Sequence, residues 1–189
     1  MWPSPRKLCG SRLTLLPLSH GHAAQLAQAT CSGSHIPEGC RLPVRHAMQD
    51  EISYWLERQA DGQSLTYSIQ SQDARLLGWV GFSQIDRAHK KLVMDNLWMN
   101  TDESGVFIEM MVMLMTYGFE VAGANTVQLP CLASKAAHRR RIEALGASLD
   151  GTLRGEKLGK DSQPQDVAIY SFIKSEWPKK SELLVSLLQ

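Results

Sequence analysis

The sequence predicts a mixed α/β fold in which helices cover one central sheet. Apolar and polar residues alternate along three consecutive segments in the middle of the chain, which is the pattern of half-buried strands. A long, very apolar helical segment follows, and after it come another strand, a basic helix and a hairpin. The expected order β-α-α-β-β-β-α-β-α-β-β is typical of a layered α/β sandwich.

The first part of the chain predicts a strand, two helices and a long loop. The strand is expected over Leu13–Leu18, and a short helix over His22–Thr30 follows with Ser19 as its cap. Residues 31–47 are rich in glycine, serine and proline and predict a long loop, either a binding lid or a disordered segment. A second helix is expected over Met48–Arg58, where apolar residues recur at helical spacing.

The centre predicts three strands and the apolar helix. The strands are expected at Leu65–Ile69, Leu77–Ile85 and Leu92–Met99. The helix is expected over Val106–Val121, with Ser104 as its cap and Gly123 as its end.

The C-terminal part predicts a strand, a basic helix, a hairpin and a short amphipathic tail. Gly146 is expected to provide the left-handed exit of the basic helix. These elements are expected at Val127–Leu132, Ser134–Ala147, Thr152–Lys157 with Val167–Lys174, and Glu182–Leu188.

Composition limits the class of protein. The 189 residues are expected to form one domain, residues 1–189. Its first segment, of about 11 residues, is expected to be flexible. The net charge of +1 gives no reason to expect nucleic-acid or membrane partners, and no apolar run reaches the roughly 20 residues that cross a bilayer. The N-terminus lacks the apolar core of a signal peptide, so we expect a cytoplasmic protein.

The four cysteines show no framework spacing, so reduced thiols are expected. Cys31, His35, Cys40 and His46 do not follow the spacing of a standard zinc site, and we expect no metal.

Five short motifs, in this order, carry a resemblance to a known family. They are Tyr117-Gly118-Phe119-Glu120, Leu145-Gly146-Ala147, Asp150-Gly151-Thr152-Leu153-Arg154, Tyr170-Ser171-Phe172 and Glu176-Trp177-Pro178. Together with the order of elements, they resemble the GNAT acyltransferases, and within these the RimJ/RimL-type branch of ribosomal-protein N-acetyltransferases.

The resemblance implies a GNAT fold with a mixed sheet of about seven strands, two splayed central strands and helices on both faces. It also implies transfer of acetyl from acetyl-CoA to an amine by direct attack. We expect the acceptor to be a protein N-terminus or a small-molecule amine, and the protein to be a monomer or a homodimer.

The same resemblance implies where the coenzyme binds. The pantetheine arm pairs with the backbone of the third central strand, and the pyrophosphate lies where the apolar helix opens, because free amides at a helix N-terminus favour an anion. The basic helix adds cations for the phosphates. The implied residues are Leu97, Trp98, Met99, Ser104, Gly105, Val106, Phe107, Lys135, His138, Arg139 and Arg141.

The phosphate loop departs from the family pattern Arg/Gln-x-x-Gly-x-Gly/Ala. The aligned residues are 102–107, in which only Gly105 matches. Asp102 and Glu103 bring like charge toward a pyrophosphate, and Phe107 replaces a small residue. The alternative is that these carboxylates only cap the helix and point outward.

The basic helix departs as well. Lys135 stands where the family has an asparagine, and His138 where it has a serine. Lys135, Arg139 and Arg141 are candidates for phosphate binding, and the alternative is a solvated basic helix face.

Two residues are candidates for proton transfer. Asp95 lies on the third central strand near the expected splay, where a carboxylate can accept the amine's proton. The alternative is that Asp95 marks a bulge or a structural hydrogen bond. His138 is a candidate to protonate the departing thiolate, and the alternative is an exposed helix histidine.

Three functions therefore stay open at the level of the sequence. The first is an N-acetyltransferase that uses acetyl-CoA. The second is a non-catalytic binding or regulatory protein of the same fold, which the altered phosphate loop favours. The third is a transferase for another acyl-CoA.

Overall fold

The computed structural model describes residues 2–30, 42–101, 103–159 and 161–188. Residues 31–41 of the expected loop, with Cys31, His35 and Cys40, lie outside the described residues. Asp102 of the expected phosphate loop lies outside them too.

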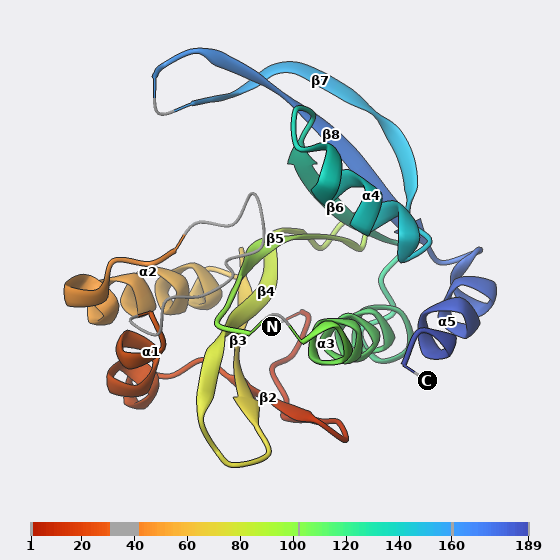
Figure 1. Cartoon of the computed structure of the whole chain (residues 1–189). Helices are drawn as coiled ribbons and strands as arrows, with labels where there is room; N and C mark the ends of the chain where they lie inside the picture. Colours follow the sequence, from red (N-terminus) through yellow and green to blue (C-terminus); the bar gives the residue numbers. More distant parts are fainter. Residues whose placement is uncertain (1, 31–41, 102, 160, 189) are drawn as a thin grey trace.

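One sheet of eight strands, in the order β1-β2-β3-β4-β5-β6-β8-β7, forms the centre of the molecule (Figure 1). About seven strands were expected, and the additional one is β1, which pairs with β2 ahead of the first expected strand. The strands are β1 (Leu8–Cys9), β2 (Leu13–Pro17), β3 (Leu65–Ser71), β4 (Leu76–Asp86), β5 (Lys91–Met99), β6 (Thr126–Leu132), β7 (Ser148–Leu158) and β8 (Pro164–Ile173).

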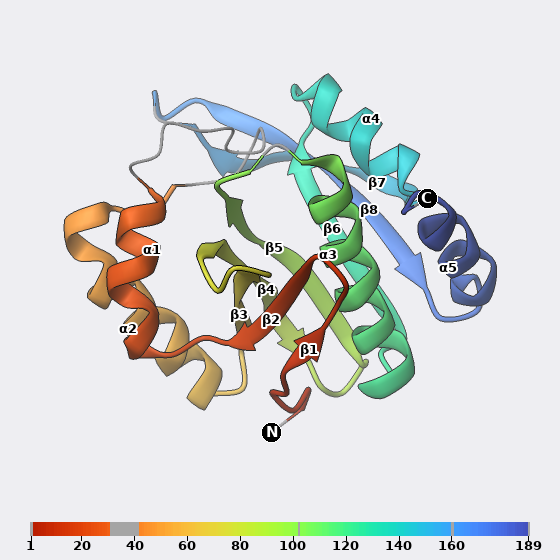
Figure 2. The same ribbon diagram turned by 60° about the horizontal axis from the view of Figure 1, so that its bottom comes forward.

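Helices cover both faces of this sheet (Figures 1 and 2). The α-helices are α1 (Ala23–Ala29), α2 (Met48–Ala60), α3 (Ser104–Thr116), α4 (Ala136–Ala144) and α5 (Trp177–Ser186). Shorter helical segments are η1 (His20–His22), η2 (Arg45–Ala47) and η3 (Tyr117–Val121). The expected mixed α/β fold with helices on both faces is confirmed.

The side chains of the strands alternate between the two faces of the sheet, and this divides the core into two parts. Tyr67 and Val80 belong to the larger part, with residues of α3, α4 and α5. Trp79, the residue before Val80 on β4, belongs to the smaller part, with Trp98 and residues of α1 and α2. Successive side chains of a strand point to opposite faces, so one amphipathic strand contributes to both cores.

The parallel pair β5–β6 is short. It joins Lys91, Leu92 and Val93 to Thr126, Val127 and Gln128, whereas β5 continues to Met99 and β6 to Leu132. Beyond these three pairs β6 pairs with β8, and β5 pairs with β4. The two central strands therefore splay apart, as expected, and leave an opening in the middle of the sheet.

The apolar helix α3 begins earlier than expected. It starts at Ser104, Glu103 occupies the cap position, and the cap makes no side-chain hydrogen bond, so the predicted cap at Ser104 was wrong. Among the described residues, the 18-residue stretch Ser104–Val121 is apolar and long enough to cross a membrane, but half of it is buried inside the molecule. That burial is typical of a core helix.

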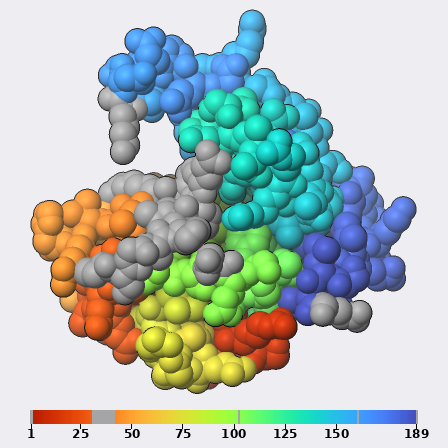
Figure 3. Space-filling model, viewed as in Figure 1, coloured from red at the N-terminus to blue at the C-terminus, as the bar shows by residue number. Residues whose placement is uncertain are grey.

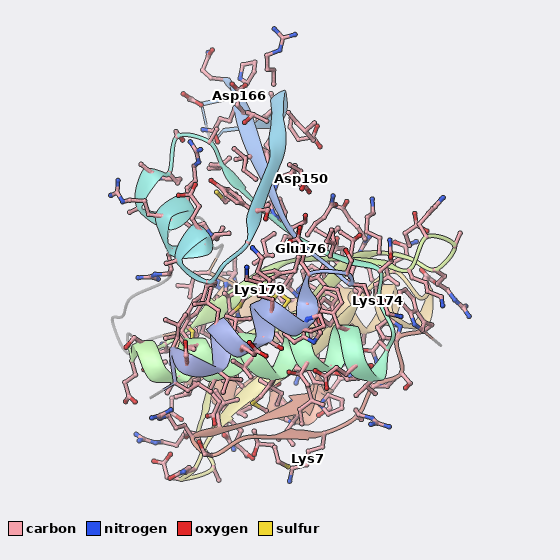
Figure 4. All side chains as sticks on the ribbon, turned by 90° about the vertical axis from the view of Figure 1, so that its right-hand side faces the viewer. Lys7, Asp150, Asp166, Lys174, Glu176 and Lys179 are labelled. Atoms are coloured by element: carbon pink, nitrogen blue, oxygen red, sulfur yellow. The ribbon has the colours of Figure 1, made fainter. Side chains whose placement is uncertain are left out.

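The hairpin of β7 and β8 extends from the sheet, and its far end stands clear of the body of the molecule (Figures 1 and 3). All eleven residues of β7 are exposed. Two carboxylates placed along the hairpin hold it together (Figure 4): Asp150 accepts a hydrogen bond from the Ser171 hydroxyl at 2.9 Å, and Asp166 accepts one from the Gly155 N–H at 2.8 Å. Both strands are longer than the expected Thr152–Lys157 and Val167–Lys174.

A buried carboxylate ties the β1–β2 turn to α3. Glu109 of α3 is only 6% exposed and accepts three hydrogen bonds. The Ser11 N–H and hydroxyl donate to Oε1 at 2.6 Å each, and the Arg12 N–H donates to Oε2 at 2.8 Å. Burial by itself would raise the pKa of this carboxyl, but the hydrogen bonds from Ser11 and Arg12 hold the pKa below its usual value.

We expect Glu109→Gln to lower the free energy of unfolding at pH 7 by about 1–3 kcal/mol, because an amide cannot accept all three bonds. The folded-state pKa lies below the usual 4.5, so this stabilisation is present above about pH 4.5 and is lost as the pH falls through the folded-state pKa. Urea unfolding at several pH values measures the difference, with Glu57→Gln, an exposed carboxylate of α2, as the control. An equal loss of unfolding free energy in Glu109→Gln at pH 7 and at pH 3.5 would contradict the view that the ionised carboxylate provides this stabilisation.

Candidate active site

A cavity of about 80 Å³ occupies the opening between the splayed strands. It is bounded by β5 and β6, by α3 and α4, and by one residue of β7. The lining residues are Met94, Asp95, Leu97, Phe107, Met111, Leu129, Pro130, Cys131, Leu132, His138, Ile142, Leu145 and Lys157. Both candidates for proton transfer, Asp95 and His138, therefore lie in one cavity.

Asp95 lies at a bulge in β5. Gly81 pairs with Asn96 and Ser83 pairs with Val93, so three steps along β5 match two along β4. The extra residue exposes Asp95, and its carboxylate accepts a hydrogen bond from the Ser83 hydroxyl. Both alternatives for Asp95, a bulge and a structural hydrogen bond, are present, and the same residue lines the cavity. Whether it accepts a proton stays a prediction.

The cavity also holds a thiol. Cys131 is buried on β6, and its sulfur donates weakly to the Leu132 carbonyl at 3.6 Å. Burial raises the pKa of this thiol above its usual value. Because the thiolate is the nucleophilic form of cysteine, Cys131 is a poor nucleophile at neutral pH.

Two guanidinium groups flank the N-terminus of α3. The Arg141 guanidinium carbon lies 5.7 Å from the centre of the Phe107 ring, a cation–π contact between α4 and α3. The Arg12 guanidinium carbon lies 3.3 Å from the place where a Cβ on Gly105 would be. The side chain of Phe107 thus forms a wall of the cavity and a support for Arg141.

The implied coenzyme-binding residues of β5 divide into two groups. Leu97 lines the cavity, but Trp98 and Met99 are each 1% exposed, with their side chains in the two cores. Only their backbone groups can meet a ligand, as the resemblance implies. Beyond Val93 the described structure places no strand beside the β5 edge that faces the opening.

The basic helix α4 begins at Ala136, two residues later than expected, with Lys135 at its cap position. Gly146 exits at φ +92°, as predicted. Arg139 faces the sheet: its Nε donates to the Tyr170 hydroxyl at 2.9 Å, and the hydroxyl donates to Glu143 at 2.5 Å. A phosphate-binding role for Arg139 and for Lys135 stays a prediction, and Arg139 has a structural role in addition.

Sequence reasoning missed Arg12, Cys131 and Lys157. Arg12 lies more than 90 residues before the loop that it flanks, and no local pattern distinguishes it from other surface arginines. Cys131 and Lys157 are single residues on strands expected for other reasons. Their spacing in the sequence does not indicate a shared site, because only the splay of the folded sheet brings them to the same cavity.

The chain belongs to the GNAT acetyltransferase family: the model of the acetyltransferase (GNAT) domain matches residues 12–148. A comparison with curated proteins gave no match.

Solved structures agree with this assignment. A protein from T. thermophilus, classed as an acetyltransferase by inference, is 25% identical, with a TM-score of 0.80 and 100% of both chains covered. A GCN5-related N-acetyltransferase from Brucella melitensis is 20% identical, with a TM-score of 0.82, and 100% of this chain and 88% of that chain are covered. A Vibrio cholerae protein assigned by inference as a ribosomal-protein-serine acetyltransferase is 15% identical, with a TM-score of 0.74 and coverage of 92% and 99%. The last two similarities show the fold alone.

We expect Arg139→Lys to lower the melting temperature of the ligand-free protein, because a lysine cannot reproduce the guanidinium bonds to Tyr170 and Ala133. A loss of about 1 kcal/mol corresponds to roughly 2–4 °C in a chain of this size. Arg141→Lys, the exposed control on the same helix, should leave the melting temperature within about 1 °C. Equal effects of the two changes in thermal unfolding would argue against a structural role specific to Arg139.

Proposed function

We propose that this chain is an N-acetyltransferase that transfers the acetyl group of acetyl-CoA to an amine. One observation carries the proposal: Asp95 and His138 both line the cavity between the splayed strands, which Phe107 in the first turn of α3 also lines. That arrangement joins an anion-binding helix end, an open strand edge and two groups able to exchange protons.

The described residues fit the coenzyme. The edge of β5 beyond Val93 offers backbone donors and acceptors to the amide groups of a pantetheine arm. The N–H groups at the start of α3 and the guanidinium groups of Arg12 and Arg141 suit a pyrophosphate. These two cations offset the acidic approach at Glu103, which was the main objection raised by the loop sequence.

The proposed chemistry is a direct transfer of the acetyl group. The acetyl thioester supplies an activated carbonyl carbon; the amine nitrogen forms the new N–C bond, and the C–S bond breaks. In the proposed mechanism, Asp95 accepts the proton that the amine loses and His138 donates one to the departing sulfur; that both residues line this cavity supports these roles. Cys131 stays a thiol, which supports direct attack over a covalent acyl-enzyme.

The branch of the family, the location and the oligomeric state are part of the same proposal. The motifs ending in Glu176-Trp177-Pro178 favour the RimJ/RimL-type branch, and the fold of the V. cholerae ribosomal-protein-serine acetyltransferase is compatible with it. We propose a cytoplasmic enzyme, either a monomer or a homodimer, without a metal.

Two alternatives stay open. Glu103 in the described part of the loop favours a non-catalytic protein of the same fold. The walls of Met94, Met111 and Leu129 would admit a longer acyl chain than acetyl if these flexible side chains rearranged.

Acetyl-CoA at about 100 times its dissociation constant should stabilise the native protein by roughly 2.7 kcal/mol, a rise in melting temperature of about 5–10 °C. We expect Arg12→Ala and Arg141→Ala each to weaken acetyl-CoA binding by about tenfold, since each removes a cation beside the pyrophosphate site. Differential scanning fluorimetry measures both effects.

Arg87→Ala, an exposed cation in the turn before β5, is the control and should leave the shift unchanged. If millimolar acetyl-CoA did not change the melting temperature of the wild-type protein, this result would contradict the proposed function. A full shift with both arginine variants would reject only the phosphate assignment.

We expect Asp95→Asn to lower kcat by about 10²–10⁴, because an amide cannot accept the amine's proton. Cys131→Ala should keep kcat within about threefold of wild type if no acyl-enzyme forms. Release of free thiol from acetyl-CoA measures both rates. A variant at Cys131 that binds acetyl-CoA normally but does not turn over would overturn direct attack.

A further inference from the structure

Two residues at the mouth of the cavity between β5 and β6 carry opposite charges. Of the described residues that line this cavity, Asp95 and Lys157 are exposed, whereas the others are buried or half-buried. An exposed side chain that lines a cavity lies where the cavity opens to solvent. A substrate that enters the cavity from solvent therefore passes a carboxylate and an ammonium group.

The β7–β8 hairpin brings Lys157 to this mouth. The last pair between β6 and β8 joins Leu132 to Val167, and Lys157 pairs with Gln165, two residues nearer the tip of the hairpin. Lys157 thus belongs to the part of the hairpin that extends past the end of β6 (Figure 1). Since its side chain lines a cavity beside β6, it is directed back toward the body of the molecule.

A bulge in β7 sets the direction of this side chain. Between Leu153 and Lys157, four steps along β7 match two along β8. Gly155 lies within the bulge at φ +63°, a conformation that favours glycine, and its N–H donates to Asp166 Oδ1 at 2.8 Å. Bulges redirect side chains beside a functional site. Both charged residues at the mouth therefore come from bulges, Asp95 from that in β5 and Lys157 from that in β7.

The two charges do not neutralise each other. Asp95 accepts a hydrogen bond from the Ser83 hydroxyl, and neither Asp95 nor Lys157 forms an ion pair with another described residue. Both line one cavity of about 80 Å³ without pairing, so space remains between the carboxylate and the ammonium group. Such an arrangement attracts the two ends of a zwitterion whose charges are a few bonds apart.

The phosphates of the coenzyme have other partners. In the proposed binding mode the pyrophosphate lies at the start of α3, beside the guanidinium groups of Arg12 and Arg141. His138 is assigned to the departing sulfur in the proposed mechanism. Among the lining residues of the cavity, all of which are described, Lys157 is the only lysine or arginine. A carboxylate on the acceptor would therefore have Lys157 as its cationic partner.

We propose that Lys157 determines acceptor specificity, and that the preferred acceptor is a small amino acid whose amine and free carboxylate are a few bonds apart. This rests on the proposed function for the acetyl transfer itself. The acceptor carboxylate forms an ion pair with the Lys157 ammonium, and the amine lies at Asp95. The N–C bond forms and the C–S bond breaks, while the amine loses one proton to Asp95 and the sulfur gains one from His138.

Pairs of acids and amides test this class of acceptor. Glycine, 3-aminopropanoate and 4-aminobutanoate are each compared with the corresponding amide, in which a neutral group replaces the carboxylate, and 1,3-diaminopropane supplies a second positive charge. For at least one acid we expect kcat/KM to exceed that of its amide by about tenfold, and that of the diamine by more. Release of free thiol from acetyl-CoA measures the rates. Equal use of acid and amide in every pair would overturn the proposal.

Variants at Lys157 test the residue. Lys157→Gln should lower kcat/KM for the preferred acid to about that of its amide and leave the amide within about twofold. Lys157→Glu should reverse the preference, so that 1,3-diaminopropane is used better than the acids. Arg154→Gln is the matched control, because Arg154 is an exposed cation of the same strand that does not line the cavity, and it should keep the wild-type preference. An unchanged preference in Lys157→Gln would reject Lys157 as the specificity residue.

Calorimetry separates this inference from the proposed function. Binding of one of the three acids to the CoA-saturated protein, weakened about tenfold by Lys157→Gln while acetyl-CoA affinity is unchanged, supports the site even if no amine is acetylated. A loss of acetyl-CoA affinity in Lys157→Gln would assign Lys157 to the coenzyme and overturn its acceptor role, but it would leave the acetyltransferase intact. Absence of both acetyl-CoA binding and turnover would reject the proposed function, and binding of the acids would still decide this inference.

A peptide acceptor tests the remaining alternative. An amidated tetrapeptide with an acidic second residue carries its amine at a polypeptide N-terminus and has no free carboxylate at its C-terminus. Acetylation of this peptide with a kcat/KM more than about tenfold above that of every amino acid would overturn the proposed acceptor class. We expect the preferred amino acid to be the better acceptor.

Discussion

The early end of the β5–β6 ladder is the constraint on which the rest of the structure depends. Three residue pairs hold the two halves of the sheet together, and β6 then follows β8 while β5 stays with β4. A continuous sheet would have buried this position under α3 and α4 and left no space at its centre. Since the strands separate, one edge of β5 is open, and a cavity forms where residues of five elements converge.

The bulge at Asp95 brings a carboxylate-bearing residue to this opening. Without the extra residue, the alternation of β5 would assign Asp95 to a single face of the sheet. With it, Asp95 lines both the cavity beside α3 and α4 and a further cavity beside α2. In the proposed reaction, this position lets the Asp95 carboxylate accept the proton that the amine loses. The hydrogen bond from Ser83 holds that carboxylate in place.

The two guanidinium groups at the start of α3 come from parts of the chain that lie far apart in the sequence. Glu109 fixes the backbone of Ser11 and Arg12, and the Arg12 side chain then lies on Gly105, one turn before Glu109 in the same helix. Arg141 reaches the same helix end from α4, supported by Phe107. Two guanidinium groups therefore lie at the start of α3, and one of them packs on Phe107, which replaces the small residue of the family pattern.

The sequence by itself determined the order and type of the elements, because periodicity and the glycine exit at Gly146 are local properties of the backbone. It also assigned Asp95 to the strand and His138 to the helix on which the structure has them, and both residues line the cavity. Tertiary structure alone decided which cations lie beside the start of α3: the backbone of Arg12 is held by a buried carboxylate that no local pattern reveals, and Arg139 turns toward Tyr170 and Glu143. It also brought Glu51, Trp79 and Asp95 to the walls of one further cavity, because these residues become neighbours only when α2 packs on the sheet. Contacts between distant segments depend on packing geometry, which the order of residues does not show.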